Sequence, residues 1–138
     1  IFIREKRFGI SANLGSLFHR RLFENVMFPV GKNIEDTRTN YKLFLESCDS
    51  TYIHKDFYVY RIRKGSLSDE MNEKLLVDKL EALLERIAVL SLIGIDISEE
   101  KVNLIDRLQI RCLQAKEAGL VDTEIYRRCT EILYLIAR

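Results

Sequence analysis

Glu35 and Asp36, two adjacent carboxylates, are the residues of this chain whose position best suits acid–base chemistry. They lie between the loop 28–34 and an amphipathic segment that begins near Thr37. At the start of a helix a carboxylate can be directed into a cleft without being buried, and within hydrogen-bond reach of a hydroxyl group it can take the proton. The alternative is that the pair only stabilises the positive end of the helix dipole.

A second group of residues has the chemistry of phosphate binding. Arg61, Arg63 and Lys64 come at the end of an aromatic segment that begins at Tyr52. Arg or Lys directed at a phosphate group that gains negative charge during a reaction stabilises the transition state more than the ground state. The alternative is a solvated basic end of a strand.

Hydrophobic patterns predict the elements that position both groups. Residues 8–18 are predicted to be extended, with Gly15 as a bend, and residues 20–26 to form a short helix. Residues 37–47 are predicted to be a helix, and residues 52–62, rich in aromatic and β-branched side chains, one or two short strands. The predicted buried face of the helix consists of Tyr41, Phe44, Leu45 and Cys48.

After Gly65 leucine replaces the aromatic residues, and the spacing predicts three helices. They cover residues 69–93, residues 98–118 and a segment after Asp122, and their short connections indicate a helical hairpin or small bundle. The predicted N-caps are Ser68, Ser98 and Asp122, and the predicted C-terminal stops are Gly94 and Gly119.

The order of four sequence pieces resembles the second half of bacterial family 2 glycosyltransferases of the GT-A fold. The pieces are the basic and apolar stretch 17–24, the Phe-Pro-x-Gly turn 28–31, the acidic pair, and the Tyr-x-Tyr-Arg run 58–61. The resemblance covers roughly residues 11–67. It implies an α/β fold: residues 1–66 would be the acceptor-side part of a GT-A domain with a few strands, and residues 67–138 an all-α extension of about three helices.

The resemblance also implies roles for the candidate residues. The intact enzyme would transfer a sugar from a nucleotide-sugar donor to a glycan or lipid-linked acceptor with inversion, with Asp36 as the general base and Glu35 orienting the acceptor or the base. Arg61, Arg63 and Lys64 would bind the donor diphosphate. On the acceptor side, Arg38 could line the cleft, and Gly15 could let the backbone approach a sugar, although a strand bend explains this glycine equally well.

No metal ligand is predicted within this chain. Many GT-A enzymes complete the coordination of a divalent cation with a histidine at the position of Arg63, and arginine cannot ligate a cation. The resemblance implies that Mg²⁺ or Mn²⁺ is bound in the intact enzyme through a D-x-D motif, which this chain lacks. His19 and His54 have no ligand partners at metal-site spacing and are interpreted as structural.

Composition restricts the partners and the class of protein. The hydrophobic content of 47% in 138 residues allows a core of ordinary domain size, which argues against disorder. A net charge of +1 provides no global field for nucleic acid or an anionic membrane. With no apolar run long enough to span a bilayer, we expect a cytoplasmic protein, with peripheral contact at the inner face of the cell membrane as an alternative. Three cysteines are expected to be small buried residues: Cys48, Cys112 and Cys129.

Two further expectations concern what surrounds this chain. It begins at Ile1 with a strand-like run, which looks like an interior cut, and the resemblance implies a preceding nucleotide-binding half. The alternative function is a non-catalytic interaction or oligomerisation module, in which the C-terminal helices form a homodimer and the acidic pair only caps a helix. In that case charges placed on Leu83 and Ile87 are expected to abolish complex formation.

Overall fold

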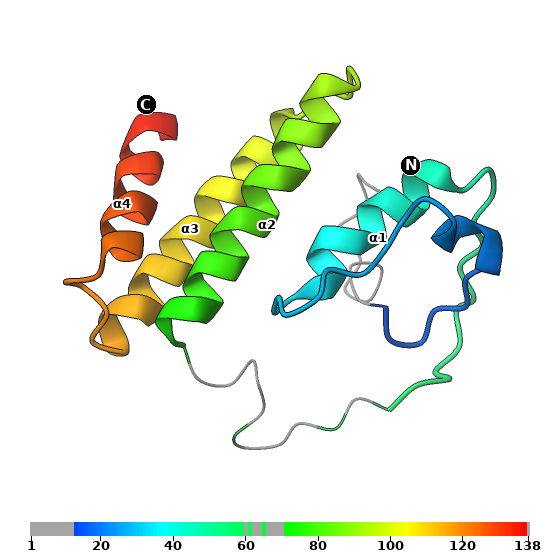
Figure 1. The fold of residues 1–138 in the computed structure, drawn as a ribbon, viewed down its shortest axis with the longest axis horizontal. Coiled ribbons are helices and arrows are strands. Elements are labelled where there is room, and N and C mark those ends of the chain that lie inside the picture. The colour runs from blue at the N-terminus through cyan, green and yellow to red at the C-terminus, as the bar shows by residue number, and fades with distance from the viewer. Residues whose placement is uncertain (1–12, 60, 62–64, 66–70, 138) are drawn as a thin grey trace. The chain divides into compact units, whose positions relative to one another are not determined.

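The computed structural model describes residues 13–59, 61, 65 and 71–137, and it divides the chain into two compact units, Ile1–Ile62 and Arg63–Arg138. Figure 1 shows the helices in chain order. The first unit contains the 3₁₀ helix η1 and the helix α1, and the second contains the helices α2, α3 and α4. Their bounds are Arg20–Phe23 for η1, Glu35–Glu46 for α1, Glu73–Leu92 for α2, Ser98–Glu117 for α3 and Glu124–Ile136 for α4.

The described part of the chain contains no strand, so the prediction of an α/β, GT-A-like fold for residues 1–66 is wrong. The described residues of the predicted strand segment, 52–59 and 61, are exposed and irregular. Aromatic and β-branched residues favour strands because they pack well on a half-buried pleated surface, and none of the described residues forms a strand that could provide one. Short local bonds form instead, since the Lys55 amide donates to the Ile53 carbonyl at 2.9 Å and the Phe57 amide to the Lys55 carbonyl at 3.1 Å.

A small apolar cluster of Leu22, Val26 and Leu43 holds η1 against α1, with Phe18 packed on it. Of the predicted helix 20–26, only residues 20–23 are helical, and they form a single 3₁₀ turn. At its start the ring Nδ1 of His19 accepts a hydrogen bond from the Arg21 amide at 3.3 Å, which gives this histidine a structural role.

Helix α1 begins two residues earlier than predicted, and its buried face agrees with the prediction only in part, since Tyr41 is buried and Phe44 is half-buried. Leu45 and Cys48 are exposed, contrary to the prediction, and Cys48 lies beyond the helix, which ends at Glu46. Tyr41 is buried as predicted, and the other buried residues of α1 are Arg38, Thr39, Asn40 and Leu43. A largely polar stretch is thus buried, which an apolar pattern could not indicate.

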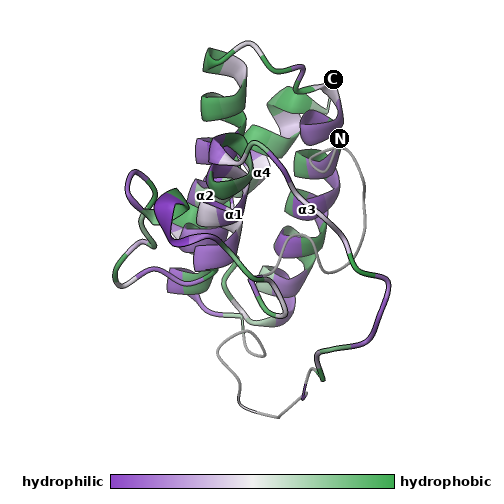
Figure 2. Ribbon diagram, turned by 90° about the vertical axis from the view of Figure 1, so that its right-hand side faces the viewer, coloured by the Kyte–Doolittle hydropathy of each residue, from purple (hydrophilic) through white to green (hydrophobic). Residues whose placement is uncertain are grey.

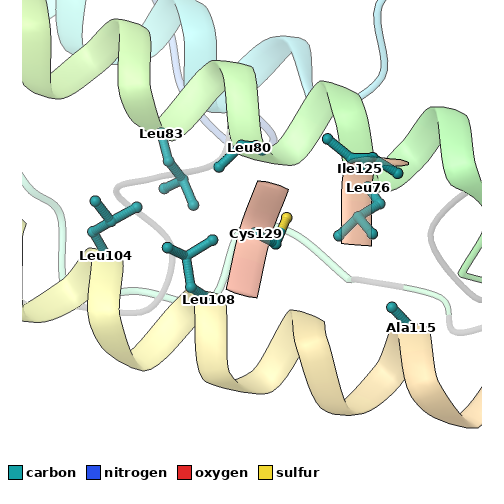
Figure 3. Packing of buried hydrophobic residues seen from close by; sticks show 8 residues of the cluster. All are labelled: Leu76, Leu80, Leu83, Leu104, Leu108, Ala115, Ile125 and Cys129. Carbon is teal, nitrogen blue, oxygen red and sulfur yellow. The ribbon is translucent and has the colours of Figure 1, made fainter. Parts of the chain in front are cut away.

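Helices α2, α3 and α4 confirm the three helices predicted for the second unit. Hydrophobic and hydrophilic residues alternate along α3 in Figure 2, as expected of an amphipathic helix. In Figure 3 the leucines of α2 point toward those of α3, and Cys129 of α4 lies between them. The buried cluster consists of Leu76, Leu80, Leu83, Leu104, Leu108, Ala115, Ile125 and Cys129.

The helices end at the predicted glycines, but their N-caps are not the predicted residues. Gly94 and Gly119 have positive φ angles of 77° and 74° just after α2 and α3, which confirms both predicted stops. α4 is capped by Thr123 rather than Asp122, because the threonine hydroxyl accepts from the Tyr126 amide at 3.3 Å.

The other two predicted caps have different outcomes. The Asn72 side chain caps α2 by accepting from the Leu75 amide at 2.9 Å, and the predicted cap Ser68 lies outside the described residues. Ser98 is already the first residue of α3, and its hydroxyl donates to Asp96 Oδ1 at 2.7 Å, so it is not the N-cap.

Candidate functional site

The acidic pair lies in the first turn of α1, where Glu35 is exposed and Asp36 is half-buried. Asp36 Oδ1 accepts hydrogen bonds from the Thr37 amide at 2.6 Å and from the Thr37 hydroxyl at 3.4 Å. The residue before the helix, Ile34, has a φ of 54° and provides no side-chain cap. One carboxylate oxygen of Asp36 therefore closes the first turn, while its Oδ2 makes no hydrogen bond within the described part of the chain.

The structure describes only one of the three predicted donor-binding residues. Arg61 is exposed, and Arg63 and Lys64 lie outside the described residues. Arg38, predicted to contact the acceptor, is 8% exposed and belongs to the buried face of α1. Among the described basic candidates, Arg61 is therefore exposed and Arg38 is buried.

An open cavity of about 680 Å³ lies within the first unit. Its lining comes from residues 14–22, from the last turns of α1 and from residues 49–58. Gly15 lines this cavity, whereas Glu35, Asp36, Arg38 and Arg61 do not. The aromatic side chains in its wall are Phe18, Phe44, Tyr52, Phe57 and Tyr58, and the acidic ones are Asp49 and Asp56.

Gly15 is the predicted acceptor residue that the structure does place at this cavity. Its φ is 75°, and a Cβ added there would lie 3.3 Å from the Cβ of Tyr58. Glycine is thus required both for the left-handed backbone and for the close approach of the two segments. The sequence indicates the bend, and only the structure shows which aromatic residue it faces.

The lining of the cavity suits a sugar. Aromatic rings provide apolar faces against which the C–H surface of a pyranose can pack, and a carboxylate such as Asp49 or Asp56 accepts hydrogen bonds from hydroxyl groups. The sequence pattern did not reveal this site, because Tyr52, Phe57 and Tyr58 fit a strand and Phe44 fits the buried face of a helix. Every residue from 51 to 59 is exposed in the structure, whereas a strand packed on a core would bury alternate residues. This exposure distinguishes the cavity wall from a strand.

Asp36 and the cavity lie toward opposite ends of α1. Eight residues separate Asp36 from Phe44, which lines the cavity, so the two are about 12 Å apart along the helix axis at a rise of 1.5 Å per residue. A ligand that contacted both would have to extend along α1, as an oligosaccharide could.

Neither a metal centre nor a membrane span is found in the described residues. No three of their His, Cys, Asp or Glu side chains are grouped so as to hold a metal ion. His54 packs its ring edge-on against Tyr52, with 4.7 Å between the ring centroids. Among the described helices, none is both long and apolar enough to cross a bilayer.

Two of the three cysteines, Cys112 and Cys129, lie in the helical core and are not reactive. Cys129 is fully buried, and burial, together with the nearby Cys112 thiol, raises its pKa to about 11 against the opposing effect of Arg128. Burial also raises the pKa of Cys112. Both thiols are therefore protonated and unreactive at neutral pH. The expected burial holds for Cys129, is partial for Cys112, and is wrong for the exposed Cys48.

Comparison with known proteins shows two bacterial relatives. The chain is 35% identical over 122 residues to glycosyltransferase GlyA of Streptococcus pneumoniae serotype 4, which is 88% of this chain and 18% of that protein. It is 27% identical over 112 residues to glycosyltransferase GlyG of the same organism, 80% of this chain and 37% of that protein. No family model and no solved structure matches the chain.

Each match is longer than either compact unit, so the similarity extends across both. The second unit, with helices α2, α3 and α4, is called the helical unit from here on. It is therefore part of what the chain shares with these two proteins, and it is not an unrelated addition. The chain spans about a fifth of the length of one relative and somewhat more than a third of the other. Over most of its own length it is thus similar to part of two proteins that are named as glycosyltransferases.

Proposed function

We propose that this chain is the acceptor-side part of an inverting family 2 glycosyltransferase, which transfers a sugar from a nucleotide-sugar donor to a glycan or lipid-linked acceptor. The observation that carries the proposal is the similarity to two glycosyltransferases across both units. The acidic pair at the start of α1 and the aromatic cavity near its end supply chemistry that fits this activity.

In the proposed reaction Asp36 is the general base. Its Oδ2 takes the proton of an acceptor hydroxyl while the oxygen attacks the anomeric carbon of the donor sugar. The new carbon–oxygen bond forms on one face as the bond to the nucleoside diphosphate breaks on the other, so the anomeric configuration inverts. The bond from the Thr37 amide to Oδ1 holds the carboxylate in place, and Glu35, exposed beside it, would orient the acceptor.

The cavity would bind sugar units of the acceptor at a distance from the reacting hydroxyl. Contacts made by such remote units can be used to position the reacting group, so they contribute to rate as well as affinity. Arg61, Arg63 and Lys64 would neutralise the departing diphosphate. A divalent cation, Mg²⁺ or Mn²⁺, would be held by residues outside this chain.

Inversion gives the proposal a direct test. We expect the full-length protein, incubated with nucleotide sugars and glycan acceptors, to release nucleoside diphosphate and to form a product whose anomeric configuration is opposite to that of the donor. Proton NMR of the anomeric position measures this configuration. A product with the configuration of the donor would exclude a single displacement with Asp36 as the base.

The acceptor role of the cavity is tested by a pair of glycine substitutions. Gly15→Ala and Gly31→Ala both force alanine into a left-handed backbone, at φ of 75° and 71°, and we expect each to lower the free energy of unfolding by about 1–2 kcal/mol. Only Gly15→Ala also presses on Tyr58, because the space around Gly31 is open. We therefore expect the KM for the acceptor to rise about two- to tenfold in Gly15→Ala alone, from loss of an aromatic contact.

The comparison of the two variants separates binding from stability. Chemical denaturation measures the backbone strain, and steady-state kinetics at saturating donor measures the acceptor KM. An equal rise of KM in both variants would show that the cavity does not bind the acceptor.

A further inference from the structure

The register of α2 against α3 is set by an ion pair and by the core. Arg86 Nη2 donates to Glu100 Oε1 at 2.6 Å, and the two side chains are only 19% and 12% exposed. The helices run antiparallel in Figure 1, and in Figure 3 the series Leu83, Leu80 and Leu76 of α2 runs beside the series Leu104, Leu108 and Ala115 of α3. The ion pair and the packing of the core leucines therefore agree on one antiparallel alignment of α2 and α3.

This alignment brings three basic residues together. Seven residues are about two helical turns, and Lys79 lies two turns before the arginine of the ion pair, on the same side of α2. Arg107 lies two turns after the glutamate on α3, and Arg111 one turn further. Because the helices are antiparallel, two turns back along α2 and two turns forward along α3 from the ion pair reach the same level of the helix pair. We refer to Lys79, Arg107 and Arg111 as the cation cluster.

The charges of the cation cluster are not neutralised by acidic side chains in the described part of the chain. Lys79 and Arg107 make no ion pair or hydrogen bond there, and Arg111 Nη1 donates to the neutral Gln114 Oε1 at 2.6 Å. Lys79 and Arg111 are half-buried. Burial and the nearby Arg111 lower the pKa of Lys79 from 10.5 to about 8, and burial and Arg107 lower the pKa of Arg111.

Such an arrangement costs free energy in the absence of a counter-charge. Partly desolvated charges of one sign repel each other more strongly than solvated ones. A multivalent anion removes this cost. Phosphate groups suit the geometry, because guanidinium groups donate paired hydrogen bonds to phosphate oxygens and an ammonium group adds a third donor.

We propose that the cation cluster of Lys79, Arg107 and Arg111 is a binding site for a phosphate or diphosphate group on the helical unit. The site consists of residues other than those proposed to bind the donor diphosphate, and the inference does not depend on the proposed transferase activity. The phosphate can belong to a soluble phosphate ester or to the headgroup of an anionic lipid, and both sources present the same chemistry.

Calorimetric titration of the 138-residue chain with inorganic pyrophosphate tests the site. We expect saturable binding to the unchanged chain and an affinity lowered roughly ten- to a hundredfold in Lys79→Gln and in Arg111→Gln, because each loses a charge-assisted hydrogen bond. Lys101→Gln, which removes an exposed positive charge from α3, is the matched control and should bind as the unchanged chain does.

The unfolding temperature provides a test of the phosphate site that does not depend on measuring affinity. Pyrophosphate should raise the unfolding temperature of the unchanged chain, since a ligand that binds only the folded state stabilises it. Lys79→Gln should unfold no earlier than the unchanged chain without the anion, because it removes a half-buried charge with no counter-charge, and its unfolding temperature should no longer respond to pyrophosphate.

Flotation with vesicles distinguishes the two phosphate sources. Recovery of the chain with phosphatidylcholine vesicles only when they contain phosphatidylglycerol, and loss of that recovery in Lys79→Gln, would identify a lipid headgroup. Pyrophosphate binding without flotation would identify a soluble phosphate ester. The proposal is overturned if the chain binds neither probe, or if both variants bind as tightly as the Lys101→Gln control.

Discussion

Asp36→Asn is expected to lower the sugar-transfer rate of the full-length protein by about two to four orders of magnitude, the range attributable to a general base. Asparagine has the same shape, so its oxygen can still accept the hydrogen bond from the Thr37 amide that now reaches Asp36 Oδ1. What is lost is the ability to take a proton. The loss should therefore be in kcat, and the acceptor KM should change little. Release of nucleoside diphosphate in the presence of acceptor measures the rate.

A second acid on α1 provides the matched control. Glu46 is exposed at the last residue of the helix, does not line the cavity, and is therefore expected to tolerate Glu46→Gln without loss of rate. Circular dichroism should show an unchanged helix content in both variants. If Asp36→Asn retains the transfer rate of the unchanged protein, the acid serves only the first turn of α1, and the interaction-module alternative gains support.

Leu108→Ala is expected to lower the free energy of unfolding of the helical unit by about 2–5 kcal/mol. Leu108 is 1% exposed and belongs to the cluster that joins all three helices. Truncation removes buried apolar surface and leaves a cavity that the surrounding leucines cannot fill. Urea denaturation followed by circular dichroism measures the change. Because an isolated unit of this size has a total stability of about 5–15 kcal/mol, the loss would be large.

Leu113→Ala is the control on the same helix. Leu113 is 59% exposed, and its truncation is expected to change stability by no more than about 0.5 kcal/mol. Equal effects at both positions would mean that the face of α3 assigned to the core is wrong.

The same core changes the test of the interaction-module alternative. Leu83 is buried in the cluster and Ile87 packs against it, so charges at either position would unfold the helical unit and would not report on association. Exposed apolar residues of α3, such as Val102 and Leu113, are the positions where a charge can test self-association without disturbing the core.

The helical unit was the more predictable half of the fold. Leucines at helical spacing and the glycines at positions 94 and 119 indicate where α2 and α3 run and end, because both signals are local. The caps were predicted one position away, at Ser98 and Asp122, since capping depends on whether a side chain can reach an amide two or three residues ahead. The cation cluster also could not be seen, because it depends on how two helices are aligned.

The first unit was less predictable for a related reason. Residues 52–59 have strand-forming composition, yet a strand exists only where another strand accepts its hydrogen bonds, and that partner is not a property of the segment itself. The cavity follows from the same fact, because the aromatic side chains left exposed meet α1 and the bend at Gly15.

By itself, the sequence determined the helices of the second unit, the position of Asp36 at a helix start, and the order of motifs that resembles glycosyltransferases. Periodicity, turn residues and motif spacing are local, and local interactions suffice to specify them. Only the tertiary structure decided that residues 52–59 form no strand, that Gly15 faces Tyr58, and that the charge of Arg111 acts on Lys79. Each of these depends on contacts between segments far apart in the chain, whose free energy no single segment contains.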